Sequence, residues 1–543
     1  MNWENEYFTR FSLIYYYPAV FTIALSSIIT PSNYTSGGKL DPKQASYDVI
    51  YYDLAFTVIP EKKYLKAKSN AKIRILSSID SLKLNLVNNY IVDEIKINNQ
   101  ISSFQHFGDI LQIKLPDNIT GMIETSIVYE GQPPVAPNPP WDGGFTWAYD
   151  SKGKPWIGMT SANEGGKIFF PCKDHPSDRA DSASISITIP KGLSAASNGK
   201  LVDIQHTDSS STFYWKTNYP IANYNINFSI GNFYKYERPF ISIKNNQMPI
   251  IFYTLEENKD KAEFHVDMAM NMISSHEKYF GEYPFISEKF GLVETPYLGM
   301  EHQTINAYGN EFKYTKLGEN LFDWLLLHEL GHEWWGNKVK SKDWSDYWIH
   351  EGICTYADAL YHREVTGEKG YHKKMSNLKN GIRNLNPIIP KRNASTDEVY
   401  QGDIYNKGSY LMHSLRFIMG DRKFFKALKE FATLDSFIYD NFVSESVFTK
   451  HFSFVGRQDL SSFIYMILYT TNLPKAIVTE VDSGKYKIEI HRLSIKFPIE
   501  IQTDKRIFRK IIGKKPIFMR SKTKPIIDPN NWYLWDRDFP TDS

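Results

Sequence analysis

The sequence predicts an α+β protein built from several domains. Its 543 residues exceed what one hydrophobic core usually supports, and 42% hydrophobic residues is ordinary for a soluble globular protein. Apolar and polar residues alternate in the first part of the chain, the apolar spacing becomes helical after about residue 255, and alternating segments return near the end. We therefore expect a β-rich domain, a mostly helical domain and a small second β domain, in that order.

Residues 1–45 are expected to precede these domains. Residues 11–30, FSLIYYYPAVFTIALSSIIT, are almost uncharged and lead into a polar stretch typical of a linker. An export signal has this character, and about 20 apolar residues can also anchor a chain in a membrane. Glu4, Glu6 and Pro18 are atypical of a signal, so a buried N-terminal element is the alternative. An exported protein, periplasmic, extracellular or membrane-anchored, is favoured over a cytoplasmic one.

Residues 46–240 are predicted to form an antiparallel β domain. Apolar and polar side chains alternate with period two, which is typical of half-buried strands. The clearest segments are 73–75, 82–86, 111–115 and 183–189. Residues 241–468 are predicted to be mostly helical, beginning with NKDKAEFHVDMAMNMISSHEKYF, and residues 469–543 to form a small β domain.

Charge and cysteine content exclude some classes of protein. The chain carries 63 basic and 61 acidic side chains, so its net charge of +2 gives no field that would favour nucleic acid, and no nucleic-acid partner is expected. Cys172 and Cys354 are too few for a disulfide framework or a cysteine zinc site. Two unpaired buried thiols are expected.

The helical region contains the pattern HExxH as HELGH, residues 328–332. His328 and His332 lie four residues apart, so on a helix both imidazoles project from one face and can reach a common metal ion, with Glu329 beside that face. A catalytic zinc site requires three protein ligands and one open position. Because HExxH also arises by chance, a helix that merely carries two histidines is the alternative until a third ligand is found.

Motifs on both sides of HExxH resemble those of one family. Glu351, in the stretch WIHEG, follows His332 after a gap of 18 residues. This spacing resembles the aminopeptidase N-like zinc metallopeptidases of the thermolysin-like class. The stretch YLGMEHQ resembles their GxMEN exopeptidase motif, and YNKG with Tyr405 resembles their tyrosine motif. FFPCKDHPSDRA resembles the end of their N-terminal β domain core, and IIDPNNWYLWDRD resembles the closing strands of their small β-sandwich.

The resemblance covers about residues 46–543 and implies an architecture. It implies an N-terminal antiparallel β domain over 46–240, a thermolysin-like, mostly helical catalytic domain over 241–468, and a small β-sandwich over 469–543. The chain resembles a short form of the family without the large C-terminal helical domain that covers the active site in many relatives.

The resemblance also implies roles for the matched residues. His328, His332 and Glu351 would hold one Zn²⁺ per chain, and Glu329 would act as the general base on water. Tyr405 would donate a hydrogen bond to the oxyanion, with Tyr400 as a weaker candidate for that role.

Selection of a free N-terminus is expected from Glu301. A carboxylate fixed one residue's length from the zinc gives the cationic α-amine of a peptide a charge-assisted partner. Gly299 and Met300 are expected to lie along the substrate as a strand edge. Relatives carry a second amine-binding Gln or Glu where this chain has Ala162, so Glu164, two residues further on, is the candidate substitute.

Two further positions depart from the family pattern. His302 stands where the motif usually has asparagine, which should change the hydrogen bonds behind Glu301 without removing its carboxylate. His350 also stands where asparagine is common and is expected either to support the metal ligands or to lie at the surface.

The sequence therefore predicts a hydrolase: a zinc metallopeptidase that removes residues from peptides with a free N-terminus. One alternative is a zinc hydrolase of the same fold acting on a non-peptide substrate such as an epoxide. Another is a catalytically silent binding scaffold, although such a protein has no reason to retain His328, Glu329, His332, Glu351 and Tyr405 together.

Overall fold

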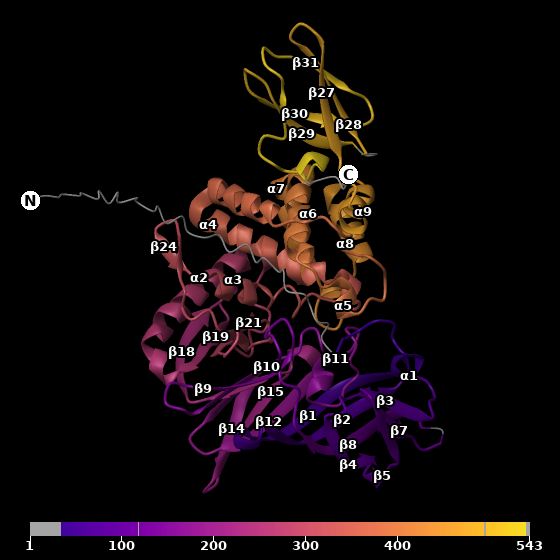
Figure 1. Cartoon of the computed structure of the whole chain (residues 1–543), viewed down its shortest axis with the longest axis vertical. Helices are drawn as coiled ribbons and strands as arrows, with labels where there is room; N and C mark the ends of the chain where they lie inside the picture. The colour runs from indigo at the N-terminus through magenta and orange to yellow at the C-terminus, as the bar shows by residue number, and fades with distance from the viewer. Residues whose placement is uncertain (1–33, 118, 493–495, 539–543) are drawn as a thin grey trace, which may run out of the picture. The chain divides into compact units, whose positions relative to one another are not determined.

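The computed structural model describes residues 34–117, 119–492 and 496–538. The predicted signal or anchor at residues 11–30 lies outside them. Along the chain, strands give way to helices and then to strands again (Figure 1), which confirms the predicted α+β class. The domain boundaries stay a prediction. Within the described residues, no helix is both long enough and apolar enough to cross a bilayer.

An eight-stranded sheet of described residues dominates the N-terminal part, in the order β14-β15-β12-β1-β2-β8-β4-β5. Neighbouring strands pair antiparallel except β1 and β12, which run parallel. The strands are β1 Tyr47–Ile59, β2 Tyr64–Ile75, β4 Tyr90–Ile97, β5 Gln100–Ile101, β8 Gly121–Gly131, β12 Ser182–Pro190, β14 Lys200–His206 and β15 Ser210–Thr217. Alternate side chains of β12 are buried, as the period of two predicted.

Smaller sheets complete the N-terminal part, in the orders β3-β7-β6, β13-β17-β10-β9 and β11-β16. Their strands are β3 Ser81–Asn85, β6 Phe104–Phe107, β7 Ile110–Lys114, β9 Gly144–Tyr149, β10 Pro155–Thr160, β11 Arg179–Ala180, β13 Ser194–Ser197, β16 Ile221–Ala222 and β17 Phe228–Gly231. The four alternating sequence segments correspond to strands β2, β3, β7 and β12, with residues 86 and 115 one position past the strand ends.

A five-stranded sheet of described residues follows, in the order β18-β19-β20-β22-β21. Its strands are β18 Phe233–Ile241, β19 Gln247–Leu255, β20 Phe290–Glu294, β21 Gly299–Met300 and β22 Asn306–Tyr308. The last four lie in the region predicted to be mostly helical, residues 241–468. Every residue of β20 is buried, so that strand has no polar face to produce alternation, and β21 and β22 are too short to show a period.

The helices after this sheet form the middle of the chain. They are α2 Ala262–Phe280, α3 Trp324–Gly331, α4 Trp348–Asn380, α5 Thr396–Val399, α6 Asp403–Met419, α7 Asp421–Thr433, α8 Glu445–Gly456 and α9 Ser461–Tyr469. Short strands lie between them: β23 Thr315–Leu317 pairs with β24 Asn320–Phe322, and β25 Lys340–Ser341 pairs with β26 Phe442–Val443.

Two glycines bring helices α4 and α6 together. A Cβ on Gly352 would lie 2.8 Å from the Ile404 carbonyl oxygen and 2.9 Å from the Gly408 Cα. Only glycine allows so close an approach of two backbones. The contact places the start of α4, which carries Glu351, against the start of α6, which carries Tyr405.

The C-terminal part contains two three-stranded sheets of described residues, β27-β28-β31 and β30-β29-β32. Their strands are β27 Lys475–Asp482, β28 Lys485–His491, β29 Phe497–Gln502, β30 Ile507–Ile512, β31 Ile517–Arg520 and β32 Ile526–Ile527. The prediction of closing strands over 526–538 is wrong beyond β32. Trp532 instead stacks on Phe417 and His413 of α6, so this aromatic segment is held by ring packing rather than by strand pairing.

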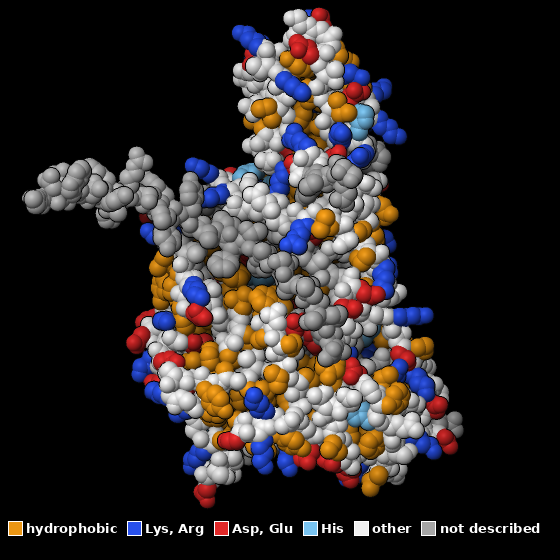
Figure 2. Space-filling model, viewed as in Figure 1, with side chains coloured by type: hydrophobic (Ala, Val, Ile, Leu, Met, Phe, Trp, Pro, Cys, Tyr) orange, Lys and Arg blue, Asp and Glu red, His pale blue; other side chains and the backbone are white. Residues whose placement is uncertain are grey.

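Residues 34–45 differ from the predicted linker. They include helix α1, Pro42–Ala45, and backbone bonds that join Ser36 to Asn163 and Gly38 to Ala394. Both free cysteines are buried, as expected. Acidic and basic side chains are interspersed over the described surface seen in Figure 2, in keeping with their nearly equal numbers.

Candidate active site

Helix α3 carries the two histidines of HExxH. Asp323 caps its start by accepting from the Leu325 and Leu326 amides, at 2.9 and 3.2 Å, which fixes where the helix begins. His328 and His332 follow on one face, and their Nε2 atoms lie 3.3 Å apart. When each ring carries its proton on Nδ1, both Nε2 atoms present lone pairs that can converge on one ion.

Glu351, at the start of α4, completes a triangle with the two histidines. Its Oε2 lies 3.6 Å from Nε2 of His328 and 3.3 Å from Nε2 of His332. A tetrahedral zinc ion with bonds of about 2.0 to 2.1 Å requires ligand atoms about 3.3 Å apart. Burial alone would raise the pKa of Glu351, but His332 and His328 outweigh it and hold that pKa low, so the carboxylate is ionised. The residues present therefore fit zinc.

Other side chains orient the two imidazoles. Nδ1 of His332 donates to the Trp335 carbonyl at 2.9 Å, and Nδ1 of His328 lies 3.4 Å from Oδ2 of Asp358. Fixing Nδ1–H in this way leaves Nε2 as the electron-pair donor toward the metal. The sequence reasoning missed Asp358, although its position seven residues after Glu351, two turns along the same helix, was a usable signal.

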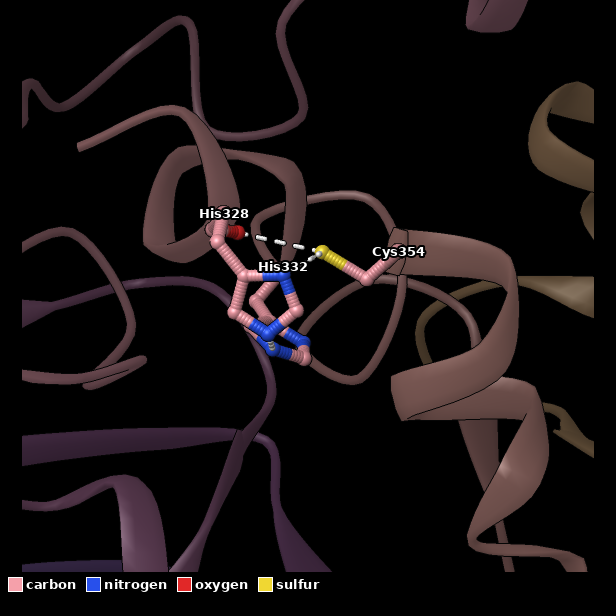
Figure 3. Close-up of side chains that lie close together, drawn as sticks. All are labelled: His328, His332 and Cys354. Atoms are coloured by element: carbon pink, nitrogen blue, oxygen red, sulfur yellow. Dashed lines mark hydrogen bonds between the residues drawn. The ribbon is translucent and has the colours of Figure 1, made fainter. Parts of the chain in front are cut away.

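Cys354 also lies beside the histidines, and its sulfur points toward His328 (Figure 3). Its Sγ donates to the main-chain carbonyl of His328 at 3.0 Å and is 3.9 Å from Nδ1 of that ring. Nδ1 is the nitrogen on the far side of the imidazole from the Glu351 carboxylate. The thiol therefore supports the helix that carries His328, and Glu351 is the better third ligand.

Glu329 lies between the histidines and the sheet edge. A Cβ on Gly299 would lie 2.6 Å from Oε1 of Glu329, so glycine at this position leaves room for that carboxylate. Burial raises the pKa of Glu329 to about 8, although both zinc-site histidines oppose the shift. A carboxylate this poorly solvated is a stronger base than one in water.

Glu301 follows β21, the edge strand of the five-stranded sheet. The amides of Asn225 and Asn337 donate to its main-chain carbonyl at 3.2 and 2.9 Å. The side chain is buried, its Oε1 accepts no hydrogen bond from the described residues, and burial raises its pKa. Such a carboxylate requires a donor, and β21 leaves its outer edge open for an extended chain.

Two tyrosines face the histidines from α6 and the turn before it. The hydroxyls of Tyr405 and Tyr400 lie 3.1 Å apart, and the Tyr405 ring centre is 6.1 Å from that of His328. Burial and the nearby Glu351 carboxylate raise the pKa of Tyr405 well above its usual value, so its hydroxyl remains a proton-bearing donor. Burial also raises the pKa of Tyr400, so both hydroxyls keep their protons at neutral pH, and one of these protons lies in the bond between the pair.

Sequence comparison agrees with this geometry. A model of the peptidase family M1 domain matches residues 264–466, and one of the peptidase M1 N-terminal domain matches residues 49–224. Together they span more than half of the chain. The chain belongs to peptidase family M1.

Curated relatives of this M1 chain include aminopeptidase 2, mitochondrial, from Saccharomyces cerevisiae and aminopeptidase N from Lactococcus lactis. Each is 23% identical, over 66% and 72% of the chain. The chain spans 38% and 48% of the length of these two relatives.

Solved structures share the M1 fold. An M1 zinc metallopeptidase from Deinococcus radiodurans, bound to a Tyr-Ser-Ala substrate, aligns with a TM-score of 0.66 at 21% identity over 79% of this chain and 95% of its own. Aminopeptidase A from Legionella pneumophila, in complex with aspartic acid, aligns with a TM-score of 0.72 at 19% identity over 91% of this chain and 59% of its own.

The two histidines at unusual positions of this M1 chain are both buried. Nε2 of His302 accepts from the Asn227 amide at 3.1 Å, so His302 faces the β domain, and burial lowers its pKa to about 3. Nε2 of His350 accepts from the Ser341 amide at 3.0 Å. The surface alternative predicted for His350 is therefore wrong, because the imidazole caps the backbone of β25.

Glu164 and Ala162 lie on the β-domain loop that follows β10. Both are buried, and a Cβ on Gly143 would clash with the Glu164 carboxylate. The main-chain carbonyl of the intervening Asn163 accepts from Ser36 and Thr396. The loop is thus fixed between the β domain and the start of α5, and the amine-binding role of Glu164 stays a prediction.

Proposed function

We propose that this chain is a zinc-dependent aminopeptidase that binds one Zn²⁺ and hydrolyses the N-terminal peptide bond of peptides. The observation that carries the proposal is the triangle of His328, His332 and Glu351 ligand atoms, with the Glu329 carboxylate beside it. The curated relatives, which are named aminopeptidases, and the peptide bound to the Deinococcus radiodurans enzyme support the substrate class.

The metal and the base divide the chemistry between them. When bound by the three ligands, zinc supplies Lewis-acid polarisation of the scissile carbonyl and of water. Glu329 accepts the proton from the attacking water and passes it to the leaving amine. Burial raises its pKa to about 8 while His328 and His332 lower it, so its basicity depends on the positive charge nearby.

Protein groups position the substrate on either side of the bond that breaks. The edge of β21 at Gly299 and Met300 pairs with the extended substrate backbone, and Glu301 binds the free α-amine through a charge-assisted hydrogen bond. The Tyr405 hydroxyl donates a hydrogen bond to the carbonyl oxygen that gains negative charge, and Tyr400 orients that hydroxyl. A carboxylate placed at the end of a strand edge permits the removal of one residue at a time.

A panel of substrates with a metal assay tests the proposal. Purified protein should contain one zinc per chain and cleave aminoacyl fluorogenic amides but not their N-acetylated forms. Dialysis against a chelator should abolish the activity and added zinc should restore it. Full activity after prolonged chelation contradicts the metal assignment, and equal cleavage of acetylated amides contradicts the aminopeptidase assignment.

A further inference from the structure

Residues 34–38, here named the strap, join the β domain to the catalytic domain beside the active site. The Ser36 amide donates to the Asn163 carbonyl at 3.0 Å and to the Thr396 hydroxyl at 3.1 Å. In return the Thr396 amide donates to the Ser36 carbonyl at 3.0 Å, and the Gly38 amide donates to the Ala394 carbonyl at 3.0 Å. The strap therefore forms a third layer between the loop that carries Glu164 and the turn that leads to Tyr400.

Side chains of the β domain hold the strap from the other side. The Lys167 ammonium donates a hydrogen bond to the Thr35 carbonyl at 2.6 Å, and the Ser36 hydroxyl donates one to Oδ1 of Asp174 at 3.3 Å. Nε2 of His175 lies 3.1 Å from the Gly38 carbonyl oxygen. Bonds on both sides of Gly37 mean that this residue cannot shift without breaking several of them.

Gly37 rests directly on the buried indole of Trp344. Its φ is 83°, and an added Cβ would lie 2.9 Å from Nε1 of Trp344 and closer still to its Cδ1. Gly38 has almost the same φ, 84°, yet no described atom lies within 4 Å of the Cβ it would carry. Adjacent glycines thus share one backbone conformation and differ in whether they contact the indole.

The Trp344 ring leads to the predicted oxyanion donor through a series of packed rings. Its centre is 4.8 Å from that of Tyr347, and the Tyr347 ring is 6.0 Å from that of Tyr400. The Tyr400 hydroxyl then meets the Tyr405 hydroxyl at 3.1 Å. Because close-packed rings have little free space, a displaced indole shifts its neighbours.

We propose that the strap is a positioning element of the active site, which holds Trp344 and through it the Tyr400–Tyr405 pair. The proposal rests on the proposed function, since it assigns Tyr405 a part in turnover. The strap acts from outside the site, and its residues are positioning residues rather than catalytic ones. The strap is then required for the rate of the reaction as well as for the joining of the two domains.

Gly37→Ala and Gly38→Ala in the full-length protein form a matched pair. Both incur the cost of a left-handed alanine, and Gly37→Ala also displaces a buried indole, so the melting temperature should fall in both variants and further in Gly37→Ala. Gly37→Ala should in addition lower kcat on an alanyl amide by on the order of ten to a hundredfold, with KM changed much less, because the oxyanion donor is misplaced. Zinc content should stay at one per chain in both variants.

A double-mutant cycle tests the route through Tyr405. In a Tyr405→Phe background, Gly37→Ala should cause little further loss of kcat, because the group it displaces is already absent. Full additivity, equal kcat for the two glycine variants, or loss of zinc in Gly37→Ala alone would each overturn the proposal.

Fluorine NMR separates this proposal from the proposed function. With 5-fluorotryptophan incorporated and the Trp344 signal assigned by Trp344→Phe, that signal should move in Gly37→Ala and stay in Gly38→Ala. An unmoved signal overturns the strap contact even in an active enzyme. An inactive wild type, by contrast, defeats the proposed function whatever the spectrum shows.

Discussion

The metal half and the substrate half of the candidate site are assembled in different ways. The metal half comes from helices α3 and α4, and its side chains, from His328 to Asp358, lie within about thirty residues of sequence. The substrate half takes Glu301 from an edge strand, Glu164 from a β-domain loop and Tyr405 from α6, with the strap behind them. Helical periodicity fixes the first set locally, whereas the second set depends on how two domains pack.

The largest expected effect concerns the third metal ligand. Glu351→Ala should lose zinc and all measurable turnover, because two histidines alone bind the ion weakly and the buried positive charge loses its counter-charge. Cys354→Ala is the matched control on the same helix, since its thiol contacts the His328 carbonyl and not the ion. Metal analysis of both proteins decides between them: zinc retained in Glu351→Ala and lost in Cys354→Ala would reverse the assignment.

Replacement of the general base, Glu329, should leave zinc bound. Glu329→Gln keeps the side-chain shape but cannot accept a proton, so kcat should fall by up to about 10⁴-fold while zinc content is unchanged. Glu333→Gln provides the comparison, because Glu333 is a buried neighbour whose Oε1 accepts from the Thr304 amide at 3.0 Å, a bond that glutamine can retain. A similar loss of kcat in both variants would mean that burial, rather than proton transfer, explains the effect.

The tyrosine pair should show unequal roles. Tyr405→Phe should lower kcat by on the order of 10² to 10³ with zinc unchanged, as expected when one oxyanion donor is removed. Tyr400→Phe should lose less, because it only supports the Tyr405 hydroxyl at 3.1 Å. Steady-state kinetics on one amide substrate measures both, and a Tyr405→Phe enzyme with wild-type kcat would transfer the role to Tyr400.

Selection of substrates with a free α-amine should depend mainly on Glu301 of the catalytic domain. Glu301→Gln should lower kcat/KM for free-amine substrates by about ten- to a hundredfold, the usual loss for one charge-assisted hydrogen bond, with the metal unaffected. Glu164→Gln should lose less in the same direction. If both carboxylates act on one amine, the loss of kcat/KM in the double variant should differ from the sum of the two single losses. A Glu301→Gln enzyme with normal kcat/KM would exclude Glu301 as the anchor.

The smallest expected effect is a pH dependence of stability at the strap. Burial raises the pKa of Asp174 to about 6, although Lys167 opposes the shift, while an unfolded aspartate titrates near 3.9. The folded protein therefore binds this proton more tightly, and the resulting stability is complete below about pH 4 and is lost as the pH rises through 6. From pH 4 to 7 the melting temperature should decline less steeply in Asp174→Asn than in the wild type. The unfolding free energy that the wild type loses through this group over that range is at most about 3 kcal/mol. Parallel pH profiles would contradict the raised pKa.

Local sequence patterns determined the elements that depend on few neighbours. The alternation over 183–189 predicted strand β12, and the four-residue spacing of His328 and His332 predicted two imidazoles on one helix face. The family motifs added Glu351, Glu301 and Tyr405 by position in the sequence. The strand and the shared helix face hold in the structure because strand and helix periods are set by the backbone itself.

Tertiary structure decided what no local period encodes. Strand β20 is buried on both faces and so carries no alternation, and residues 528–538 pack aromatic rings on α6 where strands were expected. The strap was predicted to be part of a linker because it lies in a polar stretch of sequence. Its role arises from contacts with residues more than a hundred positions away, and such contacts depend on the packing of separate domains rather than on neighbouring sequence.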